Sequence, residues 1–300
     1  MIERQRSVFR FAPSPNGELH LGHALSAMVG HDWAARVGGR FLVRIEDIDQ
    51  TRSRDHFVQS ILDDLSWLGL DWERPELRQS QHFADYAAAT ERLRRLGLVY
   101  PCFATRAEIA AAITCAASAG AAERFDPDGA PIYPGLYRGM SEHDITARYS
   151  TGERFALRLD MDKALAVAKM KLNGRPLIFR EMTQHGEERI IEAKPERWGD
   201  AILIRKDTPA SYHLSVVVDD ARQGITHVTR GQDLYASTDL HRLLQVLLDL
   251  PEPRYHHHHL LVDSDGRKLA KSTGAPRLKD LRANGVTPAD IRRQLELPAP

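Results

Sequence analysis

Short strands and amphipathic helices alternate through the first hundred residues, and this order constrains the fold more than any other feature of the sequence. The apolar spacing predicts strands at residues 8–12 and 41–46, and helices at residues 19–37, 54–68 and 84–96. Parallel strands need a crossover between them, which is usually a helix. The β-α-β-α order therefore predicts an α/β fold in which helices cover a parallel sheet.

The alternation stops near residue 100 and returns later in the chain. Residues 101–195 contain an alanine-rich helix, a turn-rich stretch and short alternating strands, so we interpret them as an inserted α+β module. The strands expected inside this module and the elements expected after it lie at residues 155–159, 177–180, 201–204, 214–218, 225–229 and 240–248. The continuous apolar run at 214–218 is typical of a central strand that is buried on both faces.

Composition excludes several classes of protein. Apolar residues make up 42% and charged residues 27% of the chain, which is usual for a globular protein and excludes extended disorder. No apolar run reaches the roughly 18 residues that a membrane helix needs, and the N-terminus does not resemble a secretory signal. Cys102 and Cys115 are too few for a disulfide framework. We therefore expect a cytoplasmic protein with no membrane attachment.

Charged side chains follow the ends of three expected strands. Arg10 and Ser14 lie at the end of the first strand, Glu46 ends the second, and Arg230 follows a later one. Ligands of open parallel sheets bind outside the carboxyl ends of the strands. Two guanidinium groups and a carboxylate there suit a zwitterion with an extra carboxylate, such as glutamate. The alternative is a set of surface ion pairs, and the sequence does not fix the side that Tyr212 faces.

Two basic segments are candidates for phosphate binding. His20, Gly22 and His23 begin the first helix, where free N–H groups and the helix dipole favour an anion. Lys268 and Lys271 lie in a loop, where they can stabilise the charge of a leaving pyrophosphate. Taken singly, each segment is more often a solvated surface than a phosphate site. Because the formal net charge is zero, a polyanionic partner must be held by such local groups.

Four segments together resemble the class I glutamyl-tRNA synthetases. Residues 10–23 (RFAPSPNGELHLGH) resemble the first signature of that family. Residues 41–49 (FLVRIEDID) and 228–234 (VTRGQDL) are similar to its later substrate segments, and residues 268–272 (KLAKS) are similar to its KMSKS loop. The resemblance implies a Rossmann-like parallel sheet of a class I synthetase catalytic core. An inserted α+β module interrupts this core, and a short helical C-terminal segment follows it.

Within this family, the chain is similar to the glutamyl-queuosine tRNA(Asp) synthetases. The similarity lies in its short length and in residues 211–220. We expect no anticodon-binding domain. The expected first half of the core is residues 1–100, and the inserted acceptor-side module is residues 101–195. The second half of the core is expected at residues 196–255, and the KMSKS-like loop with the short helical segment at residues 256–300.

The resemblance also implies site residues. Glutamate contacts fall on Arg10, Phe11, Ala12, Pro13, Ser14, Glu46, Tyr212 and Arg230, and ATP contacts fall on His20, Gly22, His23 and Lys271. The catalytic residues implied are His20, His23, Lys268 and Lys271.

The implied reaction is ATP-dependent activation of L-glutamate to glutamyl-adenylate without tRNA. Transfer to queuosine in the anticodon of tRNA(Asp) follows. ATP acts with Mg²⁺, and we expect a monomer.

The sequence departs from the subfamily at a zinc site. The corresponding positions hold Cys102, Ala104, Tyr133 and Tyr137, so only one thiolate remains. Structural zinc takes four ligands, largely Cys or His, and Cys115 lies in the alanine-rich helix. We therefore predict no tightly bound zinc and no metal site at these positions.

Two other groups of possible metal ligands have simpler interpretations. The run of histidines at residues 256–259 is expected to form a strand, in which alternate side chains face opposite sides. At most weak, adventitious metal binding follows. Asp47 and Asp49 are expected to cap the helix at 54–68 rather than to approach Mg²⁺.

Three alternatives remain at this level. The first is a compact glutamyl-tRNA synthetase that charges a tRNA 3′ end. The second is another nucleotidyl transferase with the same histidine-containing helix start, which would not need Arg10, Glu46 and Arg230. The third is a non-catalytic, synthetase-like binding protein.

Overall fold

A mainly parallel sheet forms the centre of the molecule. The computed structural model describes residues 6–120, 122–261 and 276–298. In this part of the chain, seven strands pair in the order β3-β2-β1-β9-β10-β6-β7, and only β7 runs antiparallel to its neighbour. The strands are β1 (Val8–Phe11), β2 (Arg40–Ile45), β3 (Glu73–Arg78), β6 (Ile178–Met182), β7 (Glu188–Glu192), β9 (His227–Gly231) and β10 (Arg254–His258). The expected α/β fold with a parallel sheet is confirmed.

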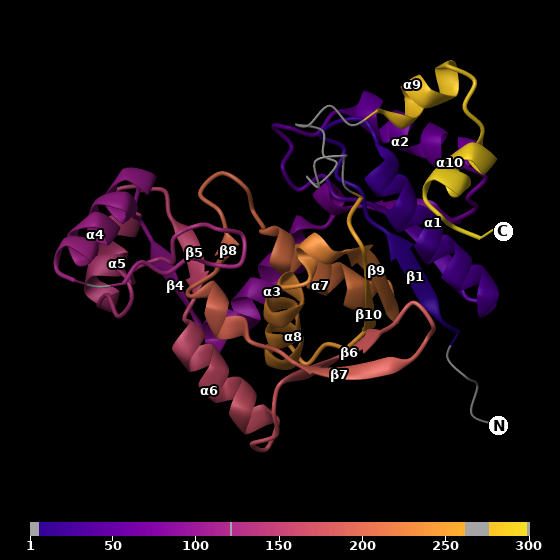
Figure 1. Cartoon of the computed structure of the whole chain (residues 1–300). Helices are drawn as coiled ribbons and strands as arrows, with labels where there is room; N and C mark the ends of the chain where they lie inside the picture. The colour runs from indigo at the N-terminus through magenta and orange to yellow at the C-terminus, as the bar shows by residue number, and fades with distance from the viewer. Residues whose placement is uncertain (1–5, 121, 262–275, 299–300) are drawn as a thin grey trace.

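Helices cover this sheet and bury its apolar side chains. They are α1 (Leu21–Arg36), α2 (Asp55–Trp67), α3 (Phe83–Arg95), α7 (Tyr212–Arg222) and α8 (Ser237–Leu247), with short 3₁₀ turns at Gln79–Gln81, Pro195–Trp198 and Gln232–Leu234. Helix α1 packs on β1, β2 and β9. The C-terminal helices α9 (Leu278–Ala283) and α10 (Pro288–Gln294) pack on the same core, where Leu278 and Ile291 are fully buried. Figure 1 shows these two helices beside α1 and α2.

A second, smaller sheet lies to one side (Figure 1). It is antiparallel and has the order β4-β5-β8, with strands β4 (Val99–Cys102), β5 (Ala156–Leu159) and β8 (Ile202–Ile204). Its neighbouring segments form α4 (Arg106–Ser118), α5 (Glu142–Ser150) and α6 (Met161–Lys171). Strands β6 and β7, which fall within residues 101–195, join the large sheet, whereas β8, after residue 195, joins the small one.

The strand expected at residues 214–218 is wrong, because this run lies within helix α7. The Ser211 side chain caps this helix by accepting a hydrogen bond from the Leu214 N–H group. The helix packs against α3 and α8, and most of its residues are buried. A helix that is buried nearly all round has no polar face, so its short apolar run looks like a buried strand.

The helix caps proposed for Asp47 and Asp49 are also wrong. Arg54 precedes α2, and no side chain caps that helix. Asp47 instead accepts hydrogen bonds from the backbone N–H and the hydroxyl of Ser80, both at 2.8 Å. Asp49 accepts hydrogen bonds from Thr51 within its own turn. Both carboxylates therefore stabilise loops at the edge of the sheet.

Candidate functional site

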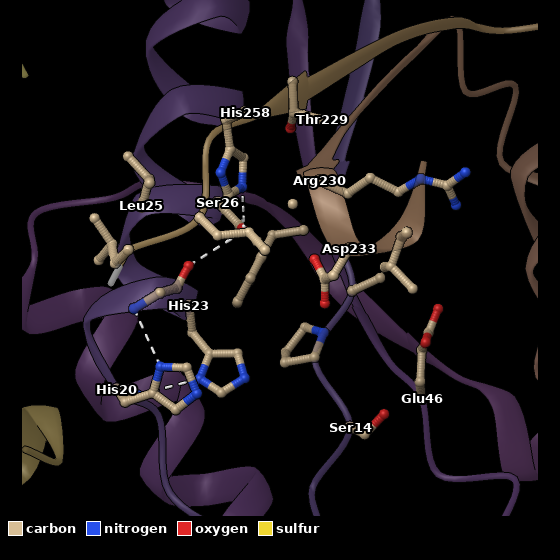
Figure 2. Close-up of a pocket in the computed structure, with 18 of the residues that line it drawn as sticks. Ser14, His20, His23, Leu25, Ser26, Glu46, Thr229, Arg230, Asp233 and His258 are labelled. Atoms are coloured by element: carbon tan, nitrogen blue, oxygen red, sulfur yellow. Dashed lines mark hydrogen bonds between the residues drawn. The ribbon is translucent and has the colours of Figure 1, made fainter. Parts of the chain in front are cut away.

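A pocket of about 640 Å³ lies at the carboxyl ends of β1, β2, β9 and β10. The sequence-predicted residues Arg10, Phe11, Ala12, Pro13, Ser14, His20, Gly22, His23, Glu46, Tyr212 and Arg230 all line it. Lys268 and Lys271 lie outside the described residues. Figure 2 shows the histidine pair on one side of the pocket and Glu46 with Arg230 on the other. The parallel strands bring these side chains together because their carboxyl ends share one edge of the sheet.

His20 and His23 form a reciprocal cap at the start of α1. The Nδ1 atom of His20 accepts a hydrogen bond from the Gly22 N–H group, and the Nδ1 atom of His23 accepts one from the His20 N–H group, both at 3.1 Å. Each neutral ring therefore carries its proton on Nε2, so that Nε2–H is the donor it offers. A Cβ atom at Gly22 would lie 3.0 Å from the His20 ring, so a side chain there would displace that imidazole.

Buried ion pairs hold Arg10 and Glu46 in the pocket. Arg10 donates to the Asp220 carboxylate at 3.2 Å, and the fully buried Arg44 donates to the same oxygen at 2.8 Å. Arg44 also lies 3.5 Å from Glu46 and 4.0 Å from Asp219. Burial alone would raise the pKa of Asp220, but the two guanidinium groups outweigh burial and hold that pKa below its usual value. Asp220 is therefore ionised and fixes Arg10.

Glu46 is a carboxyl group of the pocket whose pKa is raised. Burial raises its pKa to about 6, against the opposing effect of Arg44 and Arg10. A cationic ligand group would favour the ionised form of Glu46. Burial also raises the pKa of the Tyr212 phenol, which is therefore neutral and supplies a hydroxyl group. The pocket thus offers one site for an ammonium group at Glu46.

Arg230 is a buried cation, with only 4% of its surface exposed. Its hydrogen-bond partners within the described chain are all neutral groups, from Tyr212, Thr238, His241 and His257. Within the described chain, no carboxylate forms an ion pair with it. Buried charges in proteins are normally paired, because an unpaired one costs several kcal/mol. Among the described residues, Arg230 therefore has no carboxylate partner, and an anionic ligand can supply one.

Sequence reasoning missed several residues of this region. Ser26, Thr229, Asp233 and His258 also line the pocket. His258 comes from the histidine run, whose strand places it at the pocket beside Gly231 of β9. The Ser26 hydroxyl lies 2.7 Å from the His258 Nε2 atom. The missed signal was the strand order, since β9 and β10 must be known to be neighbours before these residues can be placed.

The former zinc positions come together without a set of zinc ligands. Cys102, Ala104 and Tyr133 are buried in one cluster, and Tyr137 packs against it. The Tyr133 hydroxyl accepts a hydrogen bond from the Tyr137 N–H group at 2.9 Å, and the Arg158 guanidinium carbon lies 3.9 Å from the centre of the Tyr133 ring. Burial and a hydrogen bond with the Cys102 thiol raise the pKa of Tyr133, so its phenol stays protonated. These residues do not fit zinc.

Treatment with a chelator will therefore leave the stability of the protein unchanged. We expect purified protein to contain no stoichiometric zinc, and its melting temperature to be the same before and after dialysis against a chelator. The aromatic and hydrogen-bonded contacts of the former zinc positions need no metal to hold β4 against residues 133–137. Metal analysis and thermal unfolding with and without added zinc measure this. A drop in melting temperature that zinc restores would contradict it.

The family model for the catalytic domain of class I tRNA synthetases (E and Q) matches residues 7–297. The chain belongs to this family. A glutamyl-Q tRNA(Asp) synthetase from Rhodobacter capsulatus is 46% identical over 97% of this chain and 100% of that protein. One from Symbiobacterium thermophilum is 38% identical over 94% of this chain and 83% of that protein.

Longer members of the class I family also match. A glutamate–tRNA ligase from Prochlorococcus marinus is 36% identical, and this chain spans 55% of it. The crystal structure of a glutamate tRNA ligase from Elizabethkingia meningosepticum, in complex with its amino acid, has a TM-score of 0.70 and 24% identity. The match covers 90% of this chain and 53% of that one, and it shows the shared fold. This class I synthetase is thus a ligase of the aminoacyl-tRNA synthetase type, and family membership implies the use of ATP.

No helix among the described residues is both long and apolar enough to span a bilayer. No group of three or more His, Cys, Asp or Glu side chains is placed to hold a metal ion in that part of the synthetase.

Proposed function

We propose that this protein activates L-glutamate with ATP in the absence of tRNA and then transfers the glutamyl group to queuosine in the anticodon of tRNA(Asp). The observation that carries the first step is the buried Arg230 cation, which has no carboxylate partner among the described residues and lies in the same pocket as Glu46. Glutamate supplies what the pocket lacks. One of its carboxylates pairs with Arg230 and its ammonium group pairs with Glu46, while Arg10 is already neutralised by Asp220.

The histidine pair lies where the triphosphate of ATP would be held. The start of α1 offers the positive end of a helix dipole and the Nε2–H donors of His20 and His23. In the reaction, an α-carboxylate oxygen of glutamate bonds to the α-phosphorus of ATP as the bond to pyrophosphate breaks. Positioning and charge stabilisation supply the catalysis. In the second step, a hydroxyl group of queuosine bonds to the acyl carbon, AMP leaves, and the hydroxyl proton is released.

The choice of acceptor rests on the relatives. Two relatives that this chain covers over most of their own length are both named glutamyl-Q tRNA(Asp) synthetase. The glutamate–tRNA ligase from Prochlorococcus marinus is almost twice as long as the matched region. The names of the first two relatives, and their higher identity to this chain, support queuosine rather than a tRNA 3′ end as the acceptor.

Two assays test the proposed function. Pyrophosphate exchange with a panel of amino acids should depend on glutamate alone and proceed without tRNA. Labelled glutamate should then be incorporated into tRNA(Asp) that carries queuosine, and not into tRNA(Asp) that lacks it. A tRNA(Asp) that carries queuosine but lacks its 3′-terminal adenosine separates the alternatives, because it keeps the queuosine hydroxyl groups and has lost the 3′ acceptor end. Incorporation that requires an intact 3′ end would favour a compact glutamyl-tRNA synthetase.

Glutamate binding will weaken as the pH falls through about 6. Burial raises the pKa of Glu46 to about 6, and protonation removes the negative charge that pairs with the substrate ammonium group. The bound ammonium favours ionised Glu46, so affinity rises with pH and levels off above that pKa. The KM for glutamate, measured in pyrophosphate exchange between pH 5 and 8, should show this inflection. The Glu46→Gln enzyme should have a KM about tenfold higher or more. An inflection that persists in this variant would contradict the assignment.

A further inference from the structure

The Arg230 side chain is held by a shell of side chains that the proposed reaction does not use. Its Nε–H group lies 3.3 Å from the His257 Nε2 atom, and its Nη2 atom donates to the Thr238 hydroxyl at 2.6 Å. Its Nη1 atom lies 3.2 Å from the His241 Nδ1 atom. His257 is the register partner of Arg230 on the neighbouring strand β10, so both side chains lie on the same face of the sheet.

The proton positions of this shell follow from the donors. A guanidinium group only donates hydrogen bonds, so the atoms of His241 and His257 that face Arg230 must be acceptors. The Nδ1 atom of His257 lies 2.9 Å from a Glu181 carboxylate oxygen, which can only accept when ionised. His257 therefore carries its proton on Nδ1 and presents the Nε2 lone pair to Arg230. The Thr238 hydroxyl accepts from Arg230 and donates to the same Nε2 atom at 3.0 Å.

The second histidine is fixed in a similar way. Since the Nδ1 atom of His241 accepts from Arg230, its proton is on Nε2, 3.1 Å from the Nδ1 atom of His213. His241 and His257 are buried and His213 is partly buried, and this burial lowers the pKa of His257 and of His213 to about 4 and that of His241 well below its ordinary value. The shell is therefore neutral at physiological pH.

We propose that His257, oriented by Glu181, is a positioning residue that directs the Arg230 guanidinium toward the substrate carboxylate without neutralising its charge. This inference rests on the proposed function. A carboxylate in direct contact with Arg230 would compete with the substrate, as Asp220 does for Arg10. The neutral His257 ring carries its proton on Nδ1 and accepts a hydrogen bond from Arg230 at Nε2. It therefore fixes the plane of the guanidinium group and leaves its positive charge available. Glu181 acts one residue further away, through the imidazole.

His256 provides a matched control on the same strand. His256 and His257 are each 8% exposed. The side chain of His256 points to the opposite face of the sheet, where its ring packs on Trp33 and its Nδ1 atom lies 2.8 Å from the Met182 carbonyl oxygen. Replacing His256 with leucine removes a buried imidazole from β10 without touching the shell of Arg230.

The experiment measures pyrophosphate exchange of the full-length chain and its His257→Leu, His257→Gln, Glu181→Leu and His256→Leu variants, with melting temperatures recorded in parallel. We expect His257→Leu to raise the KM for glutamate about tenfold or more, and to leave the KM for ATP within about twofold of the parent value. In His257→Gln, the side-chain carbonyl oxygen can accept from Arg230, so most of the affinity for glutamate should return. Glu181→Leu should show a smaller increase in the same KM, and His256→Leu should show none.

Several results would overturn the inference. In an active parent enzyme, an unchanged KM for glutamate in both His257→Leu and Glu181→Leu would do so. An equal rise in the KM for glutamate and the KM for ATP in His257→Leu would indicate a general structural role instead. The same rise in the KM for glutamate in His256→Leu would indicate this too. If His257→Leu does not fold, the Glu181→Leu variant decides the question, because the Glu181 side chain is 18% exposed and its loss disturbs the core less. A parent enzyme without glutamate-dependent exchange would overturn the proposed function and this inference with it.

Discussion

Replacing Arg230 with alanine will abolish glutamate-dependent pyrophosphate exchange at ordinary glutamate concentrations, while ATP binding persists. Arg230 is the buried cation of the pocket for which the described residues provide no carboxylate partner. Loss of one partner of a buried, charged hydrogen bond costs about 2–5 kcal/mol, so kcat/KM for glutamate should fall by about 30-fold to several thousand-fold. Exchange kinetics measure this loss, and thermal unfolding with added glutamate gives an independent reading. Glutamate should raise the melting temperature of the parent protein but not that of the variant.

A matched arginine shows whether this loss is specific. Arg254 lies at the start of β10, at the edge of the sheet away from the pocket, and pairs with Glu188 at the surface. Arg254→Ala should therefore exchange as the parent does. Arg230→Lys keeps the charge but loses the planar fork, so we expect partial activity. Unchanged glutamate kinetics in Arg230→Ala would show that another group binds the substrate carboxylates.

Local rules made part of this site predictable. The sequence predicted that Arg10, Glu46 and Arg230 follow strand ends, and the carboxyl ends of parallel strands share one edge of a sheet. The spacing of the apolar residues and the glycines next to them were enough to predict where those strands lie. The start of α1, with His20 and His23, was predictable for the same reason, because it directly follows the first strand.

The groups that hold these residues were not predictable from local signals. Asp220 follows the run at 214–218 that was expected to be a strand, but it lies on helix α7, where its carboxylate contacts Arg10 and Arg44. A helix that is buried on most sides carries no periodicity to distinguish it from a buried strand. His257 was predicted only to lie on a strand, and its contact with Arg230 depends on β10 lying beside β9. That neighbour relation is a property of the whole sheet and not of any segment.

The largest expected effect on stability comes from Arg44, and it follows from the charges around it. Arg44 is fully buried between Glu46, Asp219 and Asp220, so the Arg44→Leu variant leaves three carboxylates without their shared cation. Breaking a buried ion pair by removing one partner costs about 3–5 kcal/mol. The free energy of unfolding, measured with denaturant at pH 8, should fall by about that amount.

The dependence of this loss on pH identifies its cause. Without Arg44, burial and mutual repulsion raise the pKa values of the three carboxyl groups. The folded variant then binds more protons than the unfolded chain, so its stability relative to the parent rises as the pH falls. We expect the difference between variant and parent to be smaller at pH 5 than at pH 8. Arg40, on the same strand, forms a surface pair with Glu73, and Arg40→Leu should cost about 1 kcal/mol or less at both pH values. Equal losses in the two variants would show that the buried charges do not govern the stability of this site.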